Sequence, residues 1–340
     1  LFSASIDNFQ GKPQAASTGS AIITGDDPFK LVVSEERIFR SRATPGGLFK
    51  PTGFIKGRYP CANLYHDGVW YIGTYCLSGE PEGYNYGVMG PFVGFRWSLD
   101  DGVSWTDTDH KPESPLFADE TFGRVKLGEL HFVDFGRNLE HSPDGKAYLV
   151  GHGALEDDPD PRPANCSWIN GDQVFITRVE PSPQNINDPS KYEFFAGHDE
   201  DGNPVWSKDY KDLKPLVDWN NNCGCVTMTY NAPLGKYLMA VTDGWPTINA
   251  PFDTYILESD SMTGPWKMVA WMEDFGQQAY FVNFPSKFTG EDGRKLFLCY
   301  SANYAPIRKD GSWLFFKPRG STYSMRSEEH TSELQSLLII

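Results

Sequence analysis

The sequence predicts an all-β protein built as a β-propeller, a ring of similar sheets around a central axis. The first observation is a hairpin that recurs four times, with an apolar strand, a turn ending in glycine and an aromatic-rich second strand; the turn glycines are Gly68, Gly145, Gly235 and Gly293. The second is composition, because 14% aromatic residues, 33 glycines and 25 prolines suit short strands separated by turns. The hairpins recur too far apart for a solenoid but suit propeller blades with long loops.

Segments of strand length follow one another along the chain, with proline or glycine at the joins. They predict strands at 62–65, 70–75, 94–98, 130–135, 147–151, 173–179, 192–196, 226–230, 236–242, 254–258, 267–271, 279–284, 296–301 and 313–317. A further sheet would have to come from the two ends of the chain, with residues 2–6 or 30–33 pairing with 322–325, because ring closure protects edge strands. An incomplete first or last blade is therefore expected.

The expected domain organisation is one propeller domain over residues 1–325. Residues 326–336 match, letter for letter, the translation of a common sequencing-library adapter. We therefore interpret residues 326–340 as a non-native tail.

Charge and hydropathy limit the partners. The formal net charge of −15 argues against a nucleic-acid partner, because a phosphate backbone would be repelled. No apolar segment approaches membrane-spanning length, so no membrane partner is expected. A carbohydrate ligand fits better, and we expect a monomer. The glycosylation sequon at 165–167 predicts a secreted, extracellular protein.

The cysteines do not predict a metal site. A zinc site usually needs two closely spaced pairs of ligands, and the cysteines of this chain do not provide them. The six are Cys61, Cys76, Cys166, Cys223, Cys225 and Cys299. The cysteines could form disulfides in an oxidising compartment or remain as buried free thiols, and the sequence favours neither alternative. No cofactor is expected, although the acidic run at 156–160 could bind calcium or form a solvated loop.

A second motif supports the propeller. Residues 98–105, Ser-Leu-Asp-Asp-Gly-Val-Ser-Trp, fit the Asp-box pattern of sialidase-like propellers. Its expected role is structural, because the Asp100 side chain would accept hydrogen bonds from backbone donors in the turn while Trp105 packs below. Asp100 is therefore predicted to be a turn residue and not a catalytic acid.

Three runs of sequence resemble a known family. Residues 173–181, 187–207 and 228–239 look like a large group of five-bladed propeller proteins that includes bacterial endo-D-arabinanases. The run at 258–266, Glu-Ser-Asp-Ser-Met-Thr-Gly-Pro-Trp, is similar to a blade turn of arabinanase-like glycosidases. The resemblance covers about residues 128–304 and implies a five-bladed β-propeller.

The resemblance also implies a glycosidase that uses carboxylates from the inner strands. Glycoside hydrolysis needs one group to protonate the leaving oxygen and another to attack carbon or activate water. This chain departs from the pattern at two places. Residues 59–63 lack the Asp-Pro that opens the first blade of arabinanase-like enzymes, and Asn138 stands where the arabinanase-containing group would have an aspartate.

Three carboxylates are the candidate catalytic residues: Glu129, Asp134 and Asp243. Glu129 and Asp134 flank an inner strand, where apolar neighbours would raise the pKa of a general acid. A structural salt bridge of Asp134 with Arg137 is an equal alternative. Asp243 lies on a predicted pocket loop.

The pocket is expected where the chain enters the first strand of each hairpin and where the second and third strands are joined. Aromatic rings stack on sugars, while amides and charged groups bind hydroxyls. The predicted substrate-binding residues are Arg58, Asn63, Tyr84, His131, Arg137, His152, Trp168, Trp245, Gln278 and Asn283. Trp219, in contrast, is expected to pack a loop.

Three functions are compatible with these residues. The first is a glycoside hydrolase. The second is a polysaccharide lyase, in which a tyrosine or histidine removes the proton next to a uronate carboxylate and an arginine or histidine neutralises that carboxylate. The third is a sugar-binding propeller without catalysis, which the two departures favour.

Overall fold

The computed structural model describes residues 2–6, 19–33, 55–78, 89–120, 124–154, 167–244, 252–276, 279–302 and 324–331. Within these ranges the regular structure is β-strand and single-turn 3-10 helix, without an α-helix, which confirms the prediction of an all-β protein. No helix in this part of the chain has the length and apolar character needed to cross a membrane.

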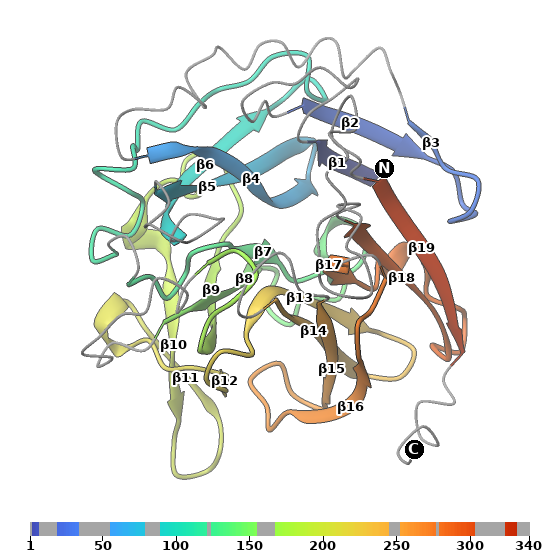
Figure 1. The fold of residues 1–340 in the computed structure, drawn as a ribbon. Coiled ribbons are helices and arrows are strands. Elements are labelled where there is room, and N and C mark those ends of the chain that lie inside the picture. The colour runs from blue at the N-terminus through green and yellow to red at the C-terminus, as the bar shows by residue number, and fades with distance from the viewer. Residues whose placement is uncertain are drawn as a thin grey trace, which may run out of the picture.

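The described strands form five antiparallel sheets, each built from a separate stretch of the chain (Figure 1). The first sheet contains β1 (Phe2–Ile6), β2 (Gly19–Thr24) and β3 (Val32–Val33). The second contains β4 (Ile55–His66), β5 (Val69–Ser78) and β6 (Met89–Ser98). The third contains β7 (His131–Phe132), β8 (Ala147–Gly153), β9 (Gln173–Val179), β10 (Glu193–His198) and β11 (Pro204–Ser207), with β12 (Val217–Asp218) paired to the start of β9.

The remaining strands complete the fourth and fifth sheets. The fourth contains β13 (Gly224–Asn231), β14 (Lys236–Asp243), β15 (Asp253–Ser259) and β16 (Lys267–Met272). The fifth contains β17 (Ala279–Asn283), β18 (Lys295–Ala302) and β19 (Ser324–Thr331). The 3-10 helices lie in the connections: η3 (Arg137–Leu139), η4 (Pro189–Lys191), η5 (Tyr210–Asp212) and η6 (Ser286–Phe288).

The four predicted hairpins form the first two strands of the second to fifth sheets, as the sequence predicted. Their turn glycines all have φ between +62° and +79°, the left-handed region that other residues avoid. Three of these glycines have open space around the Cα hydrogens, namely Gly68, Gly145 and Gly235. The backbone conformation therefore explains the glycine there, whereas crowding does not.

The prediction for the chain ends is wrong in its pairing. Residues 2–6 do form a strand, but β1 pairs with β2 in a sheet that contains no C-terminal strand. The C-terminal strand β19 pairs along its whole length with β18 instead. Sequence patterns could not decide this, because both partners offer an apolar strand of suitable length. The predicted strand at 313–317 lies outside the described residues.

The first strands of the sheets meet at the centre of the molecule, where β4, β7, β13 and β17 lie next to one another (Figure 1). The Ala62 amide donates to the Leu130 carbonyl at 2.8 Å, which joins the second sheet to the third. The Thr227 hydroxyl donates to the Val282 carbonyl, which joins the fourth sheet to the fifth. These bonds satisfy backbone groups that a purely apolar centre would leave unpaired.

Asp134 connects three sheets. Its backbone amide donates to the Met228 carbonyl and its carbonyl accepts from the Tyr230 amide, both at 2.9 Å. Its carboxylate accepts from the Ser286 hydroxyl at 2.6 Å, the Ser286 amide at 2.8 Å and the Gly136 amide at 2.9 Å. One residue thus holds three sheets together: its backbone joins the third sheet to the fourth, and its carboxylate joins the third to the fifth.

Two further polar contacts link neighbouring sheets on the same side of the molecule. Asn138 donates to the Asp67 carboxylate at 2.6 Å and accepts from the Asp67 amide at 2.7 Å, which joins the third sheet to the second. The Lys287 ammonium lies 3.4 Å from the Asp26 carboxylate, which joins the fifth sheet to the first. The terminal sheets are therefore neighbours although they share no strand.

The Asp-box motif has the predicted structural role. Asp100 accepts from the Ser104 amide and hydroxyl at 2.8 and 2.6 Å, and from the Ser98 hydroxyl at 2.8 Å. Donation from Ser104 is the main reason that the pKa of Asp100 falls to about 2. The Trp105 ring packs against Trp70, with 5.2 Å between their centroids. Both carboxylate oxygens of Asp100 therefore accept hydrogen bonds from residues of its own turn.

Replacing Asp134 by alanine should lower the free energy of unfolding by about 2–4 kcal/mol, because hydrogen bonds to a charged acceptor are worth ~1.5–3 kcal/mol each. Chemical denaturation of D134A and wild type measures the difference. Asp260→Ala is the control, since Asp260 is an exposed acid whose only polar contact in the described structure is a surface ion pair with Lys236. A D134A variant as stable as D260A would contradict the role given to Asp134.

Candidate functional site

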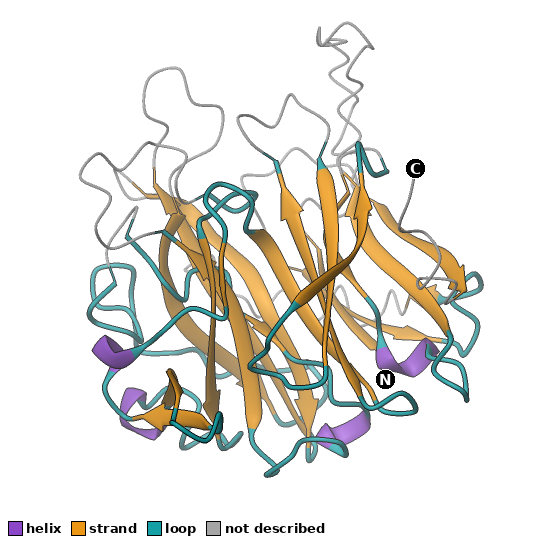
Figure 2. Cartoon of the chain, turned by 90° about the horizontal axis from the view of Figure 1, so that it is seen from below, coloured by secondary structure: helices purple, strands orange, loops and turns teal. Residues whose placement is uncertain are grey.

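The central axis has two ends, which differ in the kind of connection that the chain makes between strands. We call the end with the hairpin turns the turn end, and the end where the chain enters the inner strands the loop end. Figure 2, turned by 90° from the view of Figure 1, shows the strands running between an upper and a lower edge, with loops, turns and single-turn helices along the lower edge. The predicted site residues are divided between these two ends.

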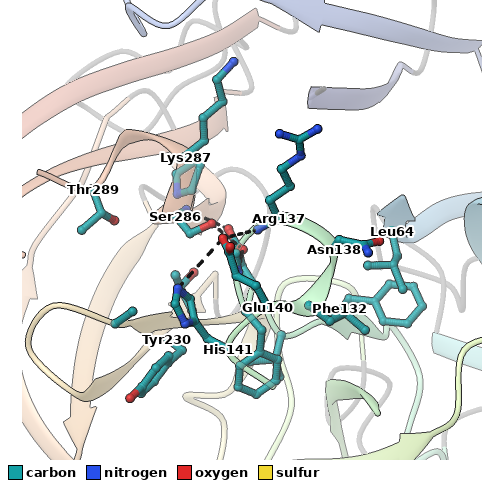
Figure 3. A pocket seen from close by; sticks show the side chains of 18 of the residues that line it. Leu64, Phe132, Arg137, Asn138, Glu140, His141, Tyr230, Ser286, Lys287 and Thr289 are labelled. Atoms are coloured by element: carbon teal, nitrogen blue, oxygen red, sulfur yellow. Dashed lines mark hydrogen bonds and ion pairs between the residues drawn. The ribbon is translucent and has the colours of Figure 1, made fainter. Parts of the chain in front are cut away.

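A cavity of about 1250 Å³ opens at the turn end (Figure 3). This is larger than the usual 300–1,000 Å³ of small-ligand sites. It is lined by residues of all five sheets and their turns. Five of the predicted site residues line it: Asn63, His131, Asp134, Arg137 and Asn283.

Hydrogen bonds within the wall of this cavity involve Glu140. Its carboxylate accepts from the Arg137 amide at 3.1 Å and lies 4.0 Å from the His141 ring, as the dashed lines in Figure 3 show. The Arg137 guanidinium itself has no hydrogen bond or ion pair with the described residues. The salt bridge between Asp134 and Arg137, offered as an alternative from the sequence, is not formed. Asp134 is structural through its bonds to Ser286 instead.

Asn138 explains one departure from the family pattern. Its backbone has φ of 58°, a conformation that asparagine tolerates better than most residues. Its amide both donates to and accepts from Asp67. An aspartate at this position would place a second negative charge against the Asp67 carboxylate and could not donate. The asparagine therefore serves the junction of two sheets at the turn end.

Glu129 lies at the loop end, two residues before β7, and its side chain is 0% exposed. Neither carboxyl oxygen has a hydrogen bond of normal geometry with the described residues, although the Tyr75 hydroxyl faces it. Burial raises the pKa of Glu129 well above its ordinary value of 4.5. Burial thus favours the protonated form of this carboxyl group, the form that a general acid needs.

Two thiols and a phenol surround Glu129. Burial, followed by the nearby Glu129 carboxylate, raises the pKa of Cys61, Cys225 and Tyr75 well above their usual range. The five cysteines of the described part are all buried free thiols. Cys225 donates to the Trp168 carbonyl at 2.9 Å. Burial in this region of the axis thus disfavours the charged forms of all four groups.

Two buried histidines lie between the two ends. Burial lowers the pKa of His131 to about 3, with a smaller contribution from His152, and lowers that of His152 to about 4. The His152 ring makes a 2.7 Å hydrogen bond with the Ser167 carbonyl, and the His131 ring packs on Phe281 at 5.0 Å. Both rings are neutral at physiological pH. A positive charge for binding an acidic sugar is therefore not supplied by them.

Glu120 provides a contrast within the same protein. It is also buried, 3% exposed, and burial raises its pKa. Its carboxylate, however, accepts from the Leu127 amide at 2.6 Å, the Tyr210 hydroxyl at 2.7 Å and the Lys126 amide at 3.0 Å. Glu120 therefore fixes a loop, whereas Glu129 is buried without such bonds.

The remaining described candidates have different surroundings. Asp243 is the last residue of β14, at the loop end. The pKa of Cys223 is raised mainly by burial, then by the charges of Asp172 and Asp218, and least by that of Asp243. Trp168 is 7% exposed and packs edge-on against Tyr280, with 4.9 Å between centroids. Trp168 is therefore enclosed in the core.

Several predicted residues cannot be placed. Tyr84, Trp245 and Gln278 and the acidic run at 156–160 lie outside the described residues, and Arg58 is described only as part of the backbone of β4. The loops 79–88, 155–166 and 245–250 of the loop end are also outside them. The pocket predicted at the loop end accordingly stays a prediction.

Tyr75, Cys61 and Cys225 were not predicted from the sequence as neighbours of Glu129. A signal was present for the two cysteines, because both lie in the first strand of a recurring hairpin and these strands meet at the axis. Tyr230 of β13 and Lys287, in the connection that follows β17, line the cavity wall and were not predicted as site residues, whereas His141, a sequence candidate for elimination, does line it. No three His, Cys, Asp or Glu side chains of the described residues are grouped to hold a metal ion.

Comparison with known proteins gives a likeness of fold. No family model matches the chain, and no curated protein matches it by sequence. A candidate hydrolase from Bacteroides ovatus has a similar structure, with a TM-score of 0.51, 13% identity, and 98% of this chain aligned to 80% of that chain. The GH43 protein BlXynB from Bacillus licheniformis has a TM-score of 0.50 and 13% identity, with 98% of this chain aligned to 52% of that chain.

These likenesses concern the fold and support the prediction of a propeller. The chain spans about half the length of the Bacillus licheniformis protein. At 13% identity they establish no family, substrate or catalytic residue.

Glu129 should make stability depend on pH. Because its pKa is higher in the folded protein than in the unfolded chain, the folded state loses stability as pH rises from about 4.5 through the folded pKa. Glu129→Gln removes this loss. The melting temperature of E129Q, measured from pH 4 to pH 8 in about one-unit steps, should therefore rise relative to wild type as pH increases. A difference that stays constant over this range would contradict the raised pKa.

Proposed function

We propose that this protein is a five-bladed propeller glycoside hydrolase in which Glu129 donates the proton to the leaving oxygen. The observation that carries the proposal is the Glu129 carboxyl group at the axis, fully buried and without hydrogen bonds of normal geometry. A carboxyl group buried in this way costs stability, and burial raises its pKa, which favours the protonated form that a general acid needs. Such groups are concentrated at functional sites.

A closed ring of five blades is supported by the contacts between the sheets. The inner strands of the second to fifth sheets lie next to one another, and β1 contacts β4. Lys287 and Asp26 connect the last sheet to the first, as do the rings of Phe29 and Phe297, which are 5.6 Å apart. A ring in which the first and last sheets meet leaves no open side on the axis.

Hydrolysis also requires a second carboxylate, and Asp243 is the better of the two other candidates. It lies at the loop end, as Glu129 does. Asp134 lies at the turn end, where three hydrogen bonds engage its carboxylate. We therefore assign Asp243 the role of general base or nucleophile, and a neutral polysaccharide or oligosaccharide as substrate.

One observation favours a second candidate function, sugar binding without catalysis. No other carboxylate of the described residues perturbs Glu129, whose proton affinity is set by burial and by Tyr75. A pair of acids close together would raise the pKa of one of them through repulsion. Binding without turnover is therefore the alternative.

Glu129→Gln should reduce hydrolysis by about 10²- to 10⁴-fold, the usual contribution of a general acid. The full chain is incubated with soluble D-arabinan, L-arabinan and xylan, and new reducing ends are counted. Glu120→Gln is the matched control, because its amide oxygen can keep the three hydrogen bonds of Glu120. It should hydrolyse at the wild-type rate.

The products separate the possible functions. Full activity in E129Q would overturn the role of Glu129. Ultraviolet-absorbing unsaturated products from a uronate-containing polymer would mean elimination. Retention on a polysaccharide without any product from the wild type would establish the sugar-binding alternative.

A further inference from the structure

Three aromatic side chains form a strip across the loop end of the fourth sheet, and the site described above does not include them. The Trp219 and Tyr255 rings are 4.6 Å apart, and the Tyr255 and Trp271 rings are nearly parallel, with 18° between planes and 6.4 Å between centroids. Tyr255 and Trp271 are direct partners across β15 and β16. We call these three residues the aromatic strip. It runs from the junction with the third sheet to the outermost strand. Tyr255 is 8% exposed and Trp219 is partly buried, so Trp271 offers most of the open ring surface.

The outer end of the strip is exposed and held in place. Trp271 is 56% exposed, which is unusual for the largest apolar side chain. Its indole nitrogen donates to the Asp253 carboxylate at 3.1 Å, and the other oxygen of Asp253 accepts from the Asp274 amide at 2.9 Å. The polar edge of the indole is thus engaged within the protein, while much of the ring is open to solvent.

Carboxylates lie along the strip. Burial is the main cause that raises the pKa of Tyr255, and the negative charges of Asp243 and Asp253 are the next largest causes. Asp218 precedes Trp219 and is exposed. Carboxylates accept hydrogen bonds from hydroxyl groups, and a flat ring packs against the C–H face of a sugar.

We propose that the aromatic strip binds a neutral polysaccharide chain outside the catalytic centre and guides it toward the axis at the loop end. This inference rests on the proposed carbohydrate substrate. The strip lies at the same end as Glu129 and Asp243, so a chain that follows it leads toward the proposed reacting groups. The strip is a binding surface, and no catalytic role is assigned to Trp271.

Charge argues against other occupants. The strip is flanked by acidic side chains, and the whole chain has a formal net charge of −15. A second copy of this protein or an acidic polymer would be repelled by this surface. A neutral chain rich in hydroxyl groups would not be repelled and would find carboxylate acceptors near Tyr255.

Trp271→Ala should weaken polysaccharide binding roughly three- to tenfold, the range expected for one aromatic stacking contact. The full chain is run in native gels cast with soluble D-arabinan, L-arabinan or xylan, and the retardation is converted to an apparent Kd. Trp271→Phe keeps a ring and should bind between wild type and W271A. Leu99→Ala is the control, because Leu99 is 65% exposed in the turn after β6, away from the fourth sheet, and L99A should bind as wild type does.

The result is independent of turnover, so failure of the two proposals can be told apart. Loss of retardation in W271A with no hydrolysis by the wild type would overturn only the hydrolase function. W271A retarded as strongly as wild type, or a wild type retarded by none of the three polymers, would overturn the strip. A wild-type dimer that becomes a monomer in W271A, measured by gel filtration without polysaccharide, would assign the strip to self-association and also overturn it.

Discussion

The hydrogen bonds of Asp134 are the interaction on which the centre of this protein most depends. Sheets that meet at an axis cannot pair edge to edge, so their innermost backbone groups need other partners. Asp134 supplies these partners at the turn end, through its own backbone to β13 and through its carboxylate to Ser286. The hydrogen bond between Asn138 and Asp67 joins the third sheet to the second in the same way, and the ion pair between Lys287 and Asp26 joins the fifth sheet to the first. Polar and charged side chains thus fix the relative positions of sheets that share no strands.

Glu129 has the opposite relation to its surroundings. Glu120 shows that this protein can satisfy a buried carboxylate with three donors, whereas Glu129 is left without them. Removing a carboxyl group from water without such bonds is unfavourable, and proteins keep unfavourable arrangements mainly where function requires them. The axis therefore has an end at Asp134 where donors satisfy a carboxylate, and an end at Glu129 where a carboxyl group is buried without them. The two acids sit five residues apart on opposite sides of the short strand β7.

Much of the fold could be predicted because its signals are local. The hairpin at Gly68 and the Asp-box turn at Asp100 depend on residues within a few positions of one another. The partner of the C-terminal strand could not be predicted, because pairing with β1 or with β18 satisfies the same apolar pattern. The site was less predictable still. Asp134 and Glu129 have similar neighbours in the sequence, and only the packing shows which one has hydrogen-bond donors.

The sequence by itself determined the all-β class, the recurring hairpins and the residues that can reach the axis, because strand period, turn glycines and apolar runs act over short distances. Tertiary structure alone decided which end of the axis each acid occupies, what satisfies it and whether its pKa shifts. It also placed Trp219, expected only to pack a loop, against Tyr255 and in line with the exposed Trp271. These properties depend on burial and on donors contributed by other sheets, and no stretch of sequence contains them.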